Sequence, residues 1–338
     1  MSINRRGALG AALATTLAAS LPVRALAQAS QAAQGAQAGT GTWPSKPIKI
    51  IVPYPPGGSS DIIARAISQP LSEALGQSVI IDNRAGANGN LGADLLAKAP
   101  ADGYTLMLCD MGALAISPSL YPKLPFDPSK DLRSVSMLAY SPHLLVVHPS
   151  VQANTLKELV ELSKKSDFNF AVTASGSTAH LAGIELQRKI GAKWEYVPYK
   201  GGVQAVLDTV AGQTQVLMNG MLATYPQVQA GKLKLIAVSK ATRMPLIGSV
   251  PTIAEQGAPG YESGTWQGVV AARGVPDAVI ARLNRELVRI IRTPDIRARL
   301  AGQGAEVVTM TVAEQDQFFA KERARWAQVI KEANVKLD

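Results

Sequence analysis

The sequence predicts an α/β protein composed of two units. From residue 47 onward, short apolar runs of the strand type alternate with helical patterns, and this alternation is typical of parallel sheets joined by right-handed crossovers. Two crossings of the chain, near residues 140 and 263, divide the pattern into two units. The chain has 338 residues, of which 47% are hydrophobic, so it can fill two cores.

The first 44 residues are expected to lie outside the folded units. Residues 1–27 have the layout of a secretory signal, with paired arginines, an apolar stretch over residues 7–21 and small residues that place the cleavage after Ala27. An uncleaved anchor helix is the alternative, but the stretch is shorter than the ~20 residues of a membrane span. Residues 28–44, rich in Gln, Ala and Gly, are expected to be a flexible leader. The paired arginines leave two export routes open, the general secretory (Sec) route and the twin-arginine route.

Charge, cysteine and histidine content argue against several function classes. The formal net charge is +9, and three of the positive charges are arginines of the predicted signal. The other basic residues are spread along the chain and rarely alternate with aromatic residues, which argues against nucleic-acid binding. The single cysteine, Cys109, is expected to be a small buried apolar residue. The three histidines lack metal-ligand spacing, so neither a metal nor a cofactor is expected.

The first unit is expected to open with three parallel strands connected by helices. The strands are residues 48–54, 78–83 and 104–110. Between the first two strands, apolar residues recur at every fourth position over residues 63–75, which indicates a helix that ends at Gly76. Pro70 is expected to kink or split this helix. A shorter helix, residues 90–99, leads to the third strand.

The second unit repeats this order. Its strands are expected at residues 143–149, 168–172, 194–199, 215–219 and 232–239, and its helices at residues 156–165, 180–190 and 203–212. Thr155 and Glu158 form a capping box before the first of these helices. The chain then returns with a strand at residues 265–272, helices near 276–292 and 294–301, a short strand at 307–308 and a last helix that a capping box opens at Thr311. The first domain is therefore expected to comprise residues 45–140 and 264–338, and the second domain residues 141–263.

The turn after the first strand is a candidate binding site. Gly57 and Gly58 let the backbone turn between the strand and the helix. Ser59, Ser60 and Asp61 follow them and are good N-cap residues. Free N–H groups and the positive end of the helix dipole would suit a carboxylate or a phosphate. No Gly-Lys-Ser/Thr follows, so the turn is not a Walker loop, and a tight connection that binds nothing is the alternative.

Two further turns offer the same chemistry. Residues 173–178 combine small hydroxyl residues with one glycine before a helix, and residues 199–202 add Lys200 as a cation. A serine paired with His180 would make the second turn hydrolytic, but the G-x-S-x-G pattern of a nucleophile elbow is missing. The glycine-rich residues 84–92 lack the order of a dinucleotide site. The sequence thus offers no assembled nucleophile, acid–base pair or metal set, and we predict a binding protein and not an enzyme.

Several long motifs resemble those of one known family. They are "VPYPPGGSSD", "NRAGANGNLGADLLAKAPADGYTLML", "ISPSLYPKLPFDP", "HLAG", "VPYKGG", "AGKLKLIAVS", "VPTIAEQGAPGYE" and "LNREL". In this order they resemble the periplasmic solute receptors of tripartite tricarboxylate transporters, also called Bug receptors, over about residues 45–338. The resemblance implies a two-domain, type II-like Venus flytrap with a ligand cleft between the domains. It also implies a periplasmic monomer that delivers a small organic carboxylate to one large and one small permease subunit in the membrane.

The resemblance also implies which residues bind the ligand. In the family, backbone amides and ordered water from two strand–helix loops hold the ligand carboxylate. By matching motif, the first loop contains Tyr54, Pro55, Pro56, Gly57, Gly58, Ser59, Ser60 and Asp61. The second loop contains Thr173, Ala174, Ser175, Gly176, Ser177 and Thr178, with His180 beside it. The expected ligand-binding set is completed by Lys200, Gly201 and Asn219.

The sequence departs from the family pattern at three places. Asn219 and Gly220 stand where the family usually has an acidic residue followed by Asn, and Gln215 stands where Asp is common. The second loop, residues 171–178, is less glycine-rich than usual. These departures leave the distal end of the ligand open among citrate-like acids, dicarboxylates, amino acids and aromatic acids. Trp194 and Trp266 keep an aromatic acid among the possible ligands. A receptor that signals to a sensor kinase and a periplasmic hydrolase are the alternatives to a transport receptor.

Overall fold

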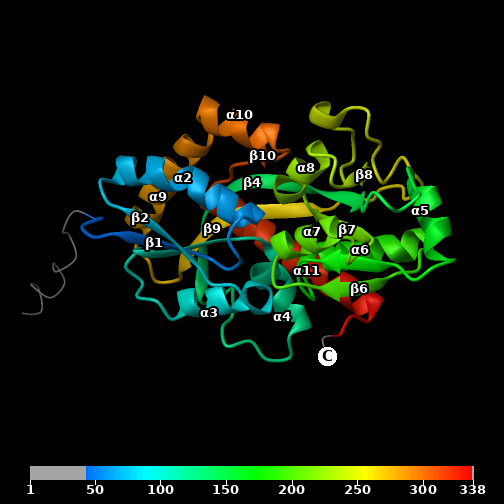
Figure 1. Ribbon diagram of the computed structural model, residues 1–338. Helices are drawn as coiled ribbons and strands as arrows, with labels where there is room; N and C mark the ends of the chain where they lie inside the picture. The colour runs from blue at the N-terminus through cyan, green and yellow to red at the C-terminus, as the bar shows by residue number, and fades with distance from the viewer. Residues whose placement is uncertain (1–42, 337–338) are drawn as a thin grey trace, which may run out of the picture. The chain divides into compact units, whose positions relative to one another are not determined.

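A computed structural model describes residues 43–336 of the chain. The residues from Lys46 onward form one compact unit, in which helices pack against a mixed sheet (Figure 1). The predicted signal, residues 1–27, and nearly all of the predicted leader, residues 28–44, lie outside the described residues. Within the described range, every helix is too short or too polar to cross a lipid bilayer.

The strands form one sheet with a parallel group at each end. The order along the sheet is β2 (Val79–Asn83), β1 (Ile48–Val52), β3 (Thr105–Cys109), β9 (Gly264–Ala272), β4 (Leu132–Val147), β7 (Val216–Gly220), β5 (Asn169–Val172) and β6 (Glu195–Pro198). Two further strands, β8 (Lys234–Val238) and β10 (Glu306–Val307), pair with β4. Pairing is parallel within β2, β1 and β3 and within β7, β5 and β6, whereas β9 and β4 pair antiparallel between these groups. We call β2, β1, β3 and β9 the first half of the sheet, and β7, β5, β6 and β8 the second half.

Strand β4 belongs to both halves of the sheet. Its residues Leu132–Pro142 pair with β9, and His143–Val147 pair with β7. The sequence predicts a strand only from residue 143, and this prediction is wrong for the segment before it. That segment carries serines at several positions, yet nearly all of it is buried. Alternation of polar and apolar residues fails as a strand signal where both faces of a sheet are covered.

Helices pack against both halves of the sheet. Those of the first half are α2 (Ser59–Leu75), α3 (Asn90–Ala97), α4 (Ser117–Leu120), α9 (Asp277–Ile291), α10 (Pro294–Gly302) and α11 (Val312–Ala333). Those of the second half are α5 (Leu156–Ser163), α6 (Thr178–Ile190), α7 (Gly202–Val210) and α8 (Met221–Gln229). The capping boxes predicted at Thr155 and Thr311 are both present. These caps fix the starts of α5 and α11.

One helix prediction is wrong, and one helix is missing from the predictions. The sequence predicts a kink or split at Pro70, but α2 continues through this residue as one helix of 17 residues. Its apolar face, which includes Ile63 and Ile67, is fully buried, and this packing outweighs the hydrogen bond that proline removes. Helix α8 is not predicted from the sequence, because it contains Pro226 and lacks a clear apolar stripe.

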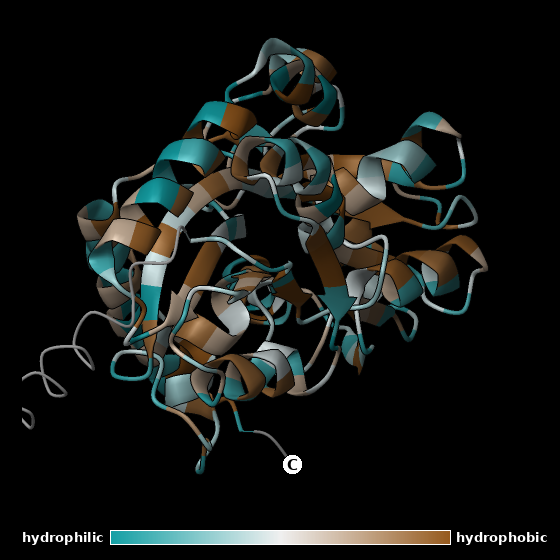
Figure 2. Cartoon of the chain, turned by 90° about the vertical axis from the view of Figure 1, so that its left-hand side faces the viewer, coloured by the Kyte–Doolittle hydropathy of each residue, from teal (hydrophilic) through white to brown (hydrophobic). Residues whose placement is uncertain are grey.

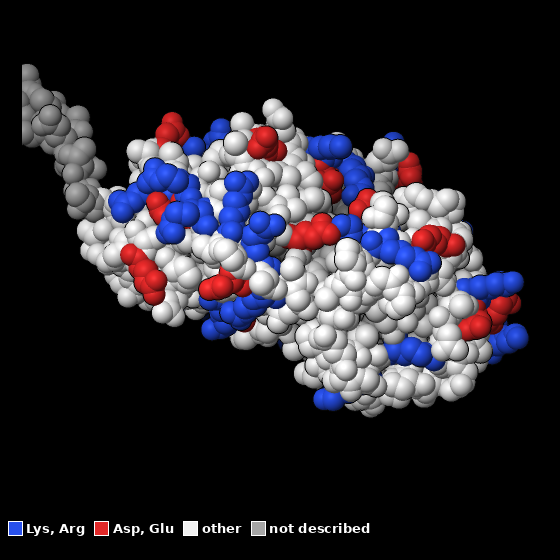
Figure 3. All heavy atoms as spheres, turned by 90° about the horizontal axis from the view of Figure 1, so that it is seen from above, with Lys and Arg blue, Asp and Glu red and all other residues white. Residues whose placement is uncertain are grey.

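Apolar strand residues form cores on the two faces of the sheet. In the second half, Leu145 and Met218 face one core, whereas Leu144 and Leu217 face another, as the two-residue period of a strand requires. Cys109 is buried in the core of the first half, as predicted. Figure 2 shows the apolar strands inside and hydrophilic helix surfaces outside. On the face shown in Figure 3, basic and acidic side chains are interspersed.

Candidate ligand-binding site

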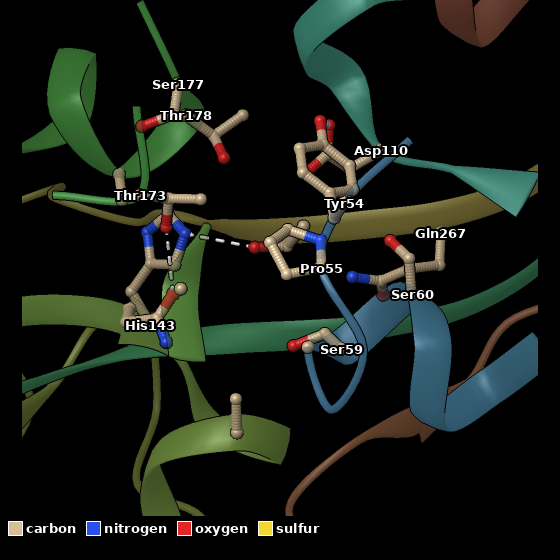
Figure 4. Close-up of a pocket in the computed structure, with 16 residues that line it drawn as sticks. Tyr54, Pro55, Ser59, Ser60, Asp110, His143, Thr173, Ser177, Thr178 and Gln267 are labelled. Atoms are coloured by element: carbon tan, nitrogen blue, oxygen red, sulfur yellow. Dashed lines mark hydrogen bonds between the residues drawn. The ribbon is translucent and has the colours of Figure 1, made fainter. Parts of the chain in front are cut away.

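The loops after four strands meet around one pocket (Figure 4). Strands β1, β5, β6 and β7 are each followed by a helix, which is α2, α6, α7 and α8 respectively. The first turn of every one of these helices contributes to the pocket lining: Ser59 and Ser60 in α2, Thr178 and Ala179 in α6, Gly202 in α7 and Ala223 in α8. The cavity measures about 40 Å³, which is room for a few water molecules or one small polar group.

The pocket gathers helix N-termini without basic side chains. The first-turn N–H groups of a helix have no partner within the helix, and the helix dipole places partial positive charge there. None of the described residues that line the pocket is Lys or Arg. Such an arrangement suits a small anion that accepts hydrogen bonds from backbone groups.

The first loop is held in place by Asp61. Its carboxylate accepts hydrogen bonds from the Gly57 N–H (2.9 Å), Arg65 Nε (2.8 Å) and Asn83 Nδ2 (3.0 Å). Burial alone would raise the pKa of Asp61, but the hydrogen bonds from Arg65, Gly57 and Asn83 outweigh it and lower the pKa. Gly57 has a φ of +84°, a conformation that side chains other than glycine rarely adopt. Asp61 therefore fixes the turn from outside the pocket.

The N-cap of α2 is Gly58, so the capping role predicted for Ser59, Ser60 and Asp61 is wrong. All three residues lie in the first turn of the helix. Asp61 reaches back to Gly57 and occupies an N–H group that would otherwise be available to a ligand. The prediction failed because a carboxylate at the third helical position can accept a hydrogen bond from an N–H group of the loop before the helix. The preference of Ser and Asp for the N-cap does not indicate this contact.

The second loop is held by neutral groups. The Gly176 N–H donates to His180 Nδ1 (3.0 Å), and the Gly176 carbonyl accepts from Asn88 Nδ2 (2.7 Å). Ser177 is the N-cap of α6, and its hydroxyl accepts from the His180 N–H (3.2 Å). Burial lowers the pKa of His180 to about 4, so the ring is neutral near pH 7. His180 thus positions the loop, and its Nδ1 bonds to the backbone and not to a serine hydroxyl.

One wall of the pocket consists of polar side chains that bond to one another. Thr173 Oγ1 donates to Asn219 Oδ1 (3.1 Å). His143 on β4 lies 3.0 Å from the Ser263 hydroxyl through Nδ1 and 3.1 Å from the Thr265 hydroxyl through Nε2. Burial lowers the pKa of His143 to about 3, so this ring is also neutral near pH 7.

Asp110 contributes a carboxylate to the pocket lining. Tyr54 Oη donates to Asp110 Oδ1 (2.5 Å), and the Gly112 N–H donates to the same oxygen (2.8 Å). Burial raises the pKa of Asp110, although both hydrogen bonds oppose the rise. Burial and the nearby Asp110 carboxylate also raise the pKa of Tyr54. Gln267 on β9 lies in the same lining and is fully buried, and neither its amide nitrogen nor its amide oxygen has a hydrogen-bond partner in the described chain.

The structure brings part of the predicted site together in this pocket. The predicted residues in its lining are Tyr54, Gly58, Ser59, Ser60, Thr173, Ser177, Thr178 and Asn219, together with Pro55. The predicted residues outside its lining are Pro56, Gly57, Asp61, Ala174, Ser175, Gly176, His180, Lys200 and Gly201. Of these, Ala174, Ser175 and Lys200 line a neighbouring cavity of about 470 Å³, which Tyr54 also lines.

Sequence reasoning missed several residues of the pocket. They are Asp110, His143, Ala179, Ala223, Thr265 and Gln267, whereas Gly202 belongs to the candidate turn at residues 199–202. Asp110 carries a usable signal, because it follows a strand at the sheet edge where open α/β folds bind ligands. His143 and Gln267 lie on β4 and β9, so only the pairing of these distant strands places them here. Among residues 43–336, no group of His, Cys, Asp and Glu could hold a metal ion.

Sequence comparison identifies relatives over most of the chain. The family described as "Tripartite tricarboxylate transporter family receptor" matches residues 63–335. Protein BugT of Bordetella pertussis is 38% identical over 299 residues, which amount to 88% of this chain and 92% of BugT. The family match and the alignment with BugT therefore both cover most of the described chain.

Solved structures show the same fold. R. palustris Rpa4515 with adipate has a TM-score of 0.84 and 33% sequence identity, over 87% of this chain and 99% of that one. MatC (Rpa3494) from Rhodopseudomonas palustris with bound malate has a TM-score of 0.81 and 31% identity, over 85% of this chain and all of that one. The chain thus has the α/β fold of periplasmic binding proteins. It belongs to the solute receptor family of the tripartite tricarboxylate transporters.

Proposed function

We propose that the protein is a periplasmic receptor that binds a small carboxylate in this pocket as a monomer and passes it unchanged to the membrane subunits of its transporter. One observation carries the proposal: the first turns of α2, α6, α7 and α8 converge on a pocket with no Lys or Arg in its described lining. Backbone N–H groups, including those of Ser59 and Thr178, and ordered water would hold the carboxylate oxygens. The adipate and malate in the two solved relatives support a carboxylate ligand. The periplasmic location rests on the family and on the signal predicted over residues 1–27.

Capture of the ligand would close two domains on each other, residues 45–140 with 264–338 and residues 141–263. The pairing partner of β4 changes from β9 to β7 between Pro142 and His143, which supports a boundary there. A ligand that contacts α2 from one domain and α6 from the other stabilises the closed arrangement over the open one. We expect micromolar affinity, about −8 kcal/mol, because the N–H groups are already oriented before the ligand arrives.

Binding of carboxylic acids to the mature chain, from Gln28, tests this proposal. Thermal unfolding is measured with acids of increasing length, and each acid is compared with its uncharged amide. A saturable rise in melting temperature with one or two acids, absent with their amides, is expected; at a hundredfold excess over Kd it corresponds to about 2.7 kcal/mol. An equal rise with the amides, or no rise with any acid, would contradict the proposal.

The role of the backbone can be tested by proline at the first helical position. Ser59 is the first residue of α2 and follows Gly58 in an extended conformation, so Ser59→Pro removes one N–H group in a position where helices accept proline. We expect Ser59→Pro to weaken acid binding by at least about tenfold, the scale of one hydrogen bond to a charged group. Ser59→Ala keeps the N–H group and should bind as the wild type does.

A matched control is available at α11. Val312 is also a first helical residue after an extended N-cap, and its helix begins outside the pocket lining. Val312→Pro should leave acid binding unchanged. If Ser59→Pro folded and bound acids as tightly as Val312→Pro, binding through the α2 amide would be ruled out.

A further inference from the structure

Asp110 is placed where it can recognise a second group of the ligand. It follows β3, lines the pocket, and lies beside Tyr54 in Figure 4. The Tyr54 hydroxyl (2.5 Å) and the Gly112 N–H (2.8 Å) both donate to Oδ1. Because both donors reach the same oxygen, Oδ2 is the oxygen that remains for a ligand.

Asp110 lacks the positive partner that Asp61 has. The Asp61 carboxylate pairs with Arg65 at 2.8 Å, whereas no described Lys or Arg forms an ion pair with Asp110 or lines the pocket. His143 also lines the pocket, but its two ring nitrogens form hydrogen bonds with the hydroxyls of Ser263 and Thr265. A partly buried carboxylate without a cation is unfavourable, and a cationic group of a ligand would supply the missing partner.

We infer that the ligand is an amino acid, whose carboxylate lies at the helix N-termini and whose ammonium group lies at Asp110. This inference rests on the proposed function, since it assigns the rest of the ligand in the same pocket. The helix N-termini present positive partial charge and Asp110 presents negative charge, so the pocket has the polarity that complements a zwitterion. An acid without an ammonium group would bring a second negative charge close to Asp110.

The lining and the remaining polar groups of the pocket agree with this ligand. In an α-amino acid one carbon atom separates the carboxylate from the ammonium group, so the two groups must bind next to each other, and Asp110 and the first turns of the four helices line the same pocket. Gln267 is fully buried in the lining and has no hydrogen-bond partner within the described residues, so it offers one more donor and one more acceptor. A hydroxyl group at the same carbon could also donate to Asp110, but it would leave the negative charge without a cation.

Isothermal titration of the mature chain with matched acids tests the inference. Each series keeps the carbon skeleton and varies the group on the second carbon: propionate, lactate and alanine; succinate, malate and aspartate; glutarate, 2-hydroxyglutarate and glutamate. In the series that fits the pocket, we expect the amino member to bind at least about tenfold tighter than the other two, as one charge-assisted hydrogen bond would provide.

The variant Asp110→Asn isolates the charge. It keeps the shape and one oxygen that can accept from Tyr54 and Gly112, but it removes the negative charge. Its affinity for the amino member should therefore fall by at least about tenfold. The unsubstituted acid should bind this variant as well as it binds the wild type, or better. Asp102→Asn is the control, because it removes the same charge from an exposed pair with Lys46 and should change no affinity.

The outcomes separate this inference from the proposed function. If the hydroxy or unsubstituted acid bound as tightly as the amino acid, or if Asp110→Asn weakened all three alike, Asp110 would be a structural residue and the inference would be overturned. If no acid of any series bound, the proposed function itself would fail. If Asp110→Asn did not fold, the order of the three affinities in the wild type would still decide.

Discussion

The two loops that build the pocket share one plan but are held by different forces. Each runs from a strand through a glycine with positive φ to a helix N-terminus, with Gly57 (φ +84°) before α2 and Gly176 (φ +74°) before α6. The first loop depends on a charged network around Asp61, and the second depends on neutral hydrogen bonds from Asn88 and to His180. Similar backbone turns can thus be fixed by charge or without it, and the two loops should differ in their response to mutation and to acid.

The largest effect is expected from Asp61→Ala. This change leaves the Gly57 N–H and the Asn83 amide without their acceptor and Arg65 without its partner. The Asp61 side chain is only 3% exposed, so we expect a loss of about 2–3 kcal/mol in the free energy of unfolding. Arg65 is half-exposed, and water already screens its share of the network. Urea unfolding monitored by circular dichroism measures the loss.

The control for Asp61→Ala is Glu161→Ala. Glu161 forms a pair of the same kind with Lys164, but on the surface of α5, where ion pairs contribute little. A small change in the control beside a large one at Asp61 is expected. Equal changes would mean that the network around the first loop is no stronger than a surface pair.

A smaller effect is expected from Gly176→Ala in the second loop. The residue has a positive φ, and a Cβ atom there would overlap with the side chain of Leu120. The strain of the left-handed conformation costs about 1 kcal/mol, and the displacement of Leu120 should bring the total to about 2 kcal/mol. The affinity for carboxylic acids, measured by calorimetry, should fall as well, because the loop that positions the start of α6 must move.

Gly191→Ala provides the matched control for the second loop. Gly191 also has a positive φ (+65°), but it ends α6, and an added Cβ would meet no atom within 4 Å. It should therefore lose about 1 kcal/mol of stability from backbone strain alone and keep its affinity for acids. Loss of affinity in both variants would show that the overlap with Leu120 is not what disturbs the pocket.

The last effect is expected in the response to acid. The pKa of His180 is about 4 in the folded chain and near 6.5 when unfolded, so the unfolded chain binds more protons between these values. Stability should therefore fall as the pH falls from about 6.5 toward 4, by at most about 1.4 kcal/mol per pH unit for this group. His143 adds a loss of the same sign, since its pKa is also lowered. The pKa of Asp61 is lowered from a value already near 3.8, so the first loop should weaken only in more acidic solution.

Unfolding of His180→Asn at about pH 7 and about pH 5 measures the share of His180. The amide oxygen of Asn can replace Nδ1 as the acceptor for the Gly176 N–H, but it does not titrate. The variant should lose about 2 kcal/mol less than the wild type between the two pH values. An identical loss in both proteins would place the acid sensitivity elsewhere, with His143 as the first residue to test.

The features that could be predicted from the sequence depend on residues close together in the chain. The features that were missed depend on contacts between distant strands. The glycine turns before α2 and α6 are recognisable because turn residues, helix caps and apolar periodicity lie within a few residues of one another. Asp61 could be placed at the start of α2, but its acceptor role toward Asn83 depends on the pairing of β1 with β2. Likewise, Gln267 reaches the pocket only because β9 pairs with β3 and β4 across the middle of the sheet.

The pairing of Pro142 with Gly264 has a consequence for how such a chain can change over time. These residues are partners on neighbouring antiparallel strands, so the segment between them leaves and re-enters the first half of the sheet at one place. Cα atoms paired in this way are about 5 Å apart, a gap that a tight hairpin turn can span. The segment is therefore topologically an insertion with adjacent ends. Its length and composition, and with them α6, α7 and α8, can diverge while the strands that precede Tyr54 and Asp110 keep their pairing.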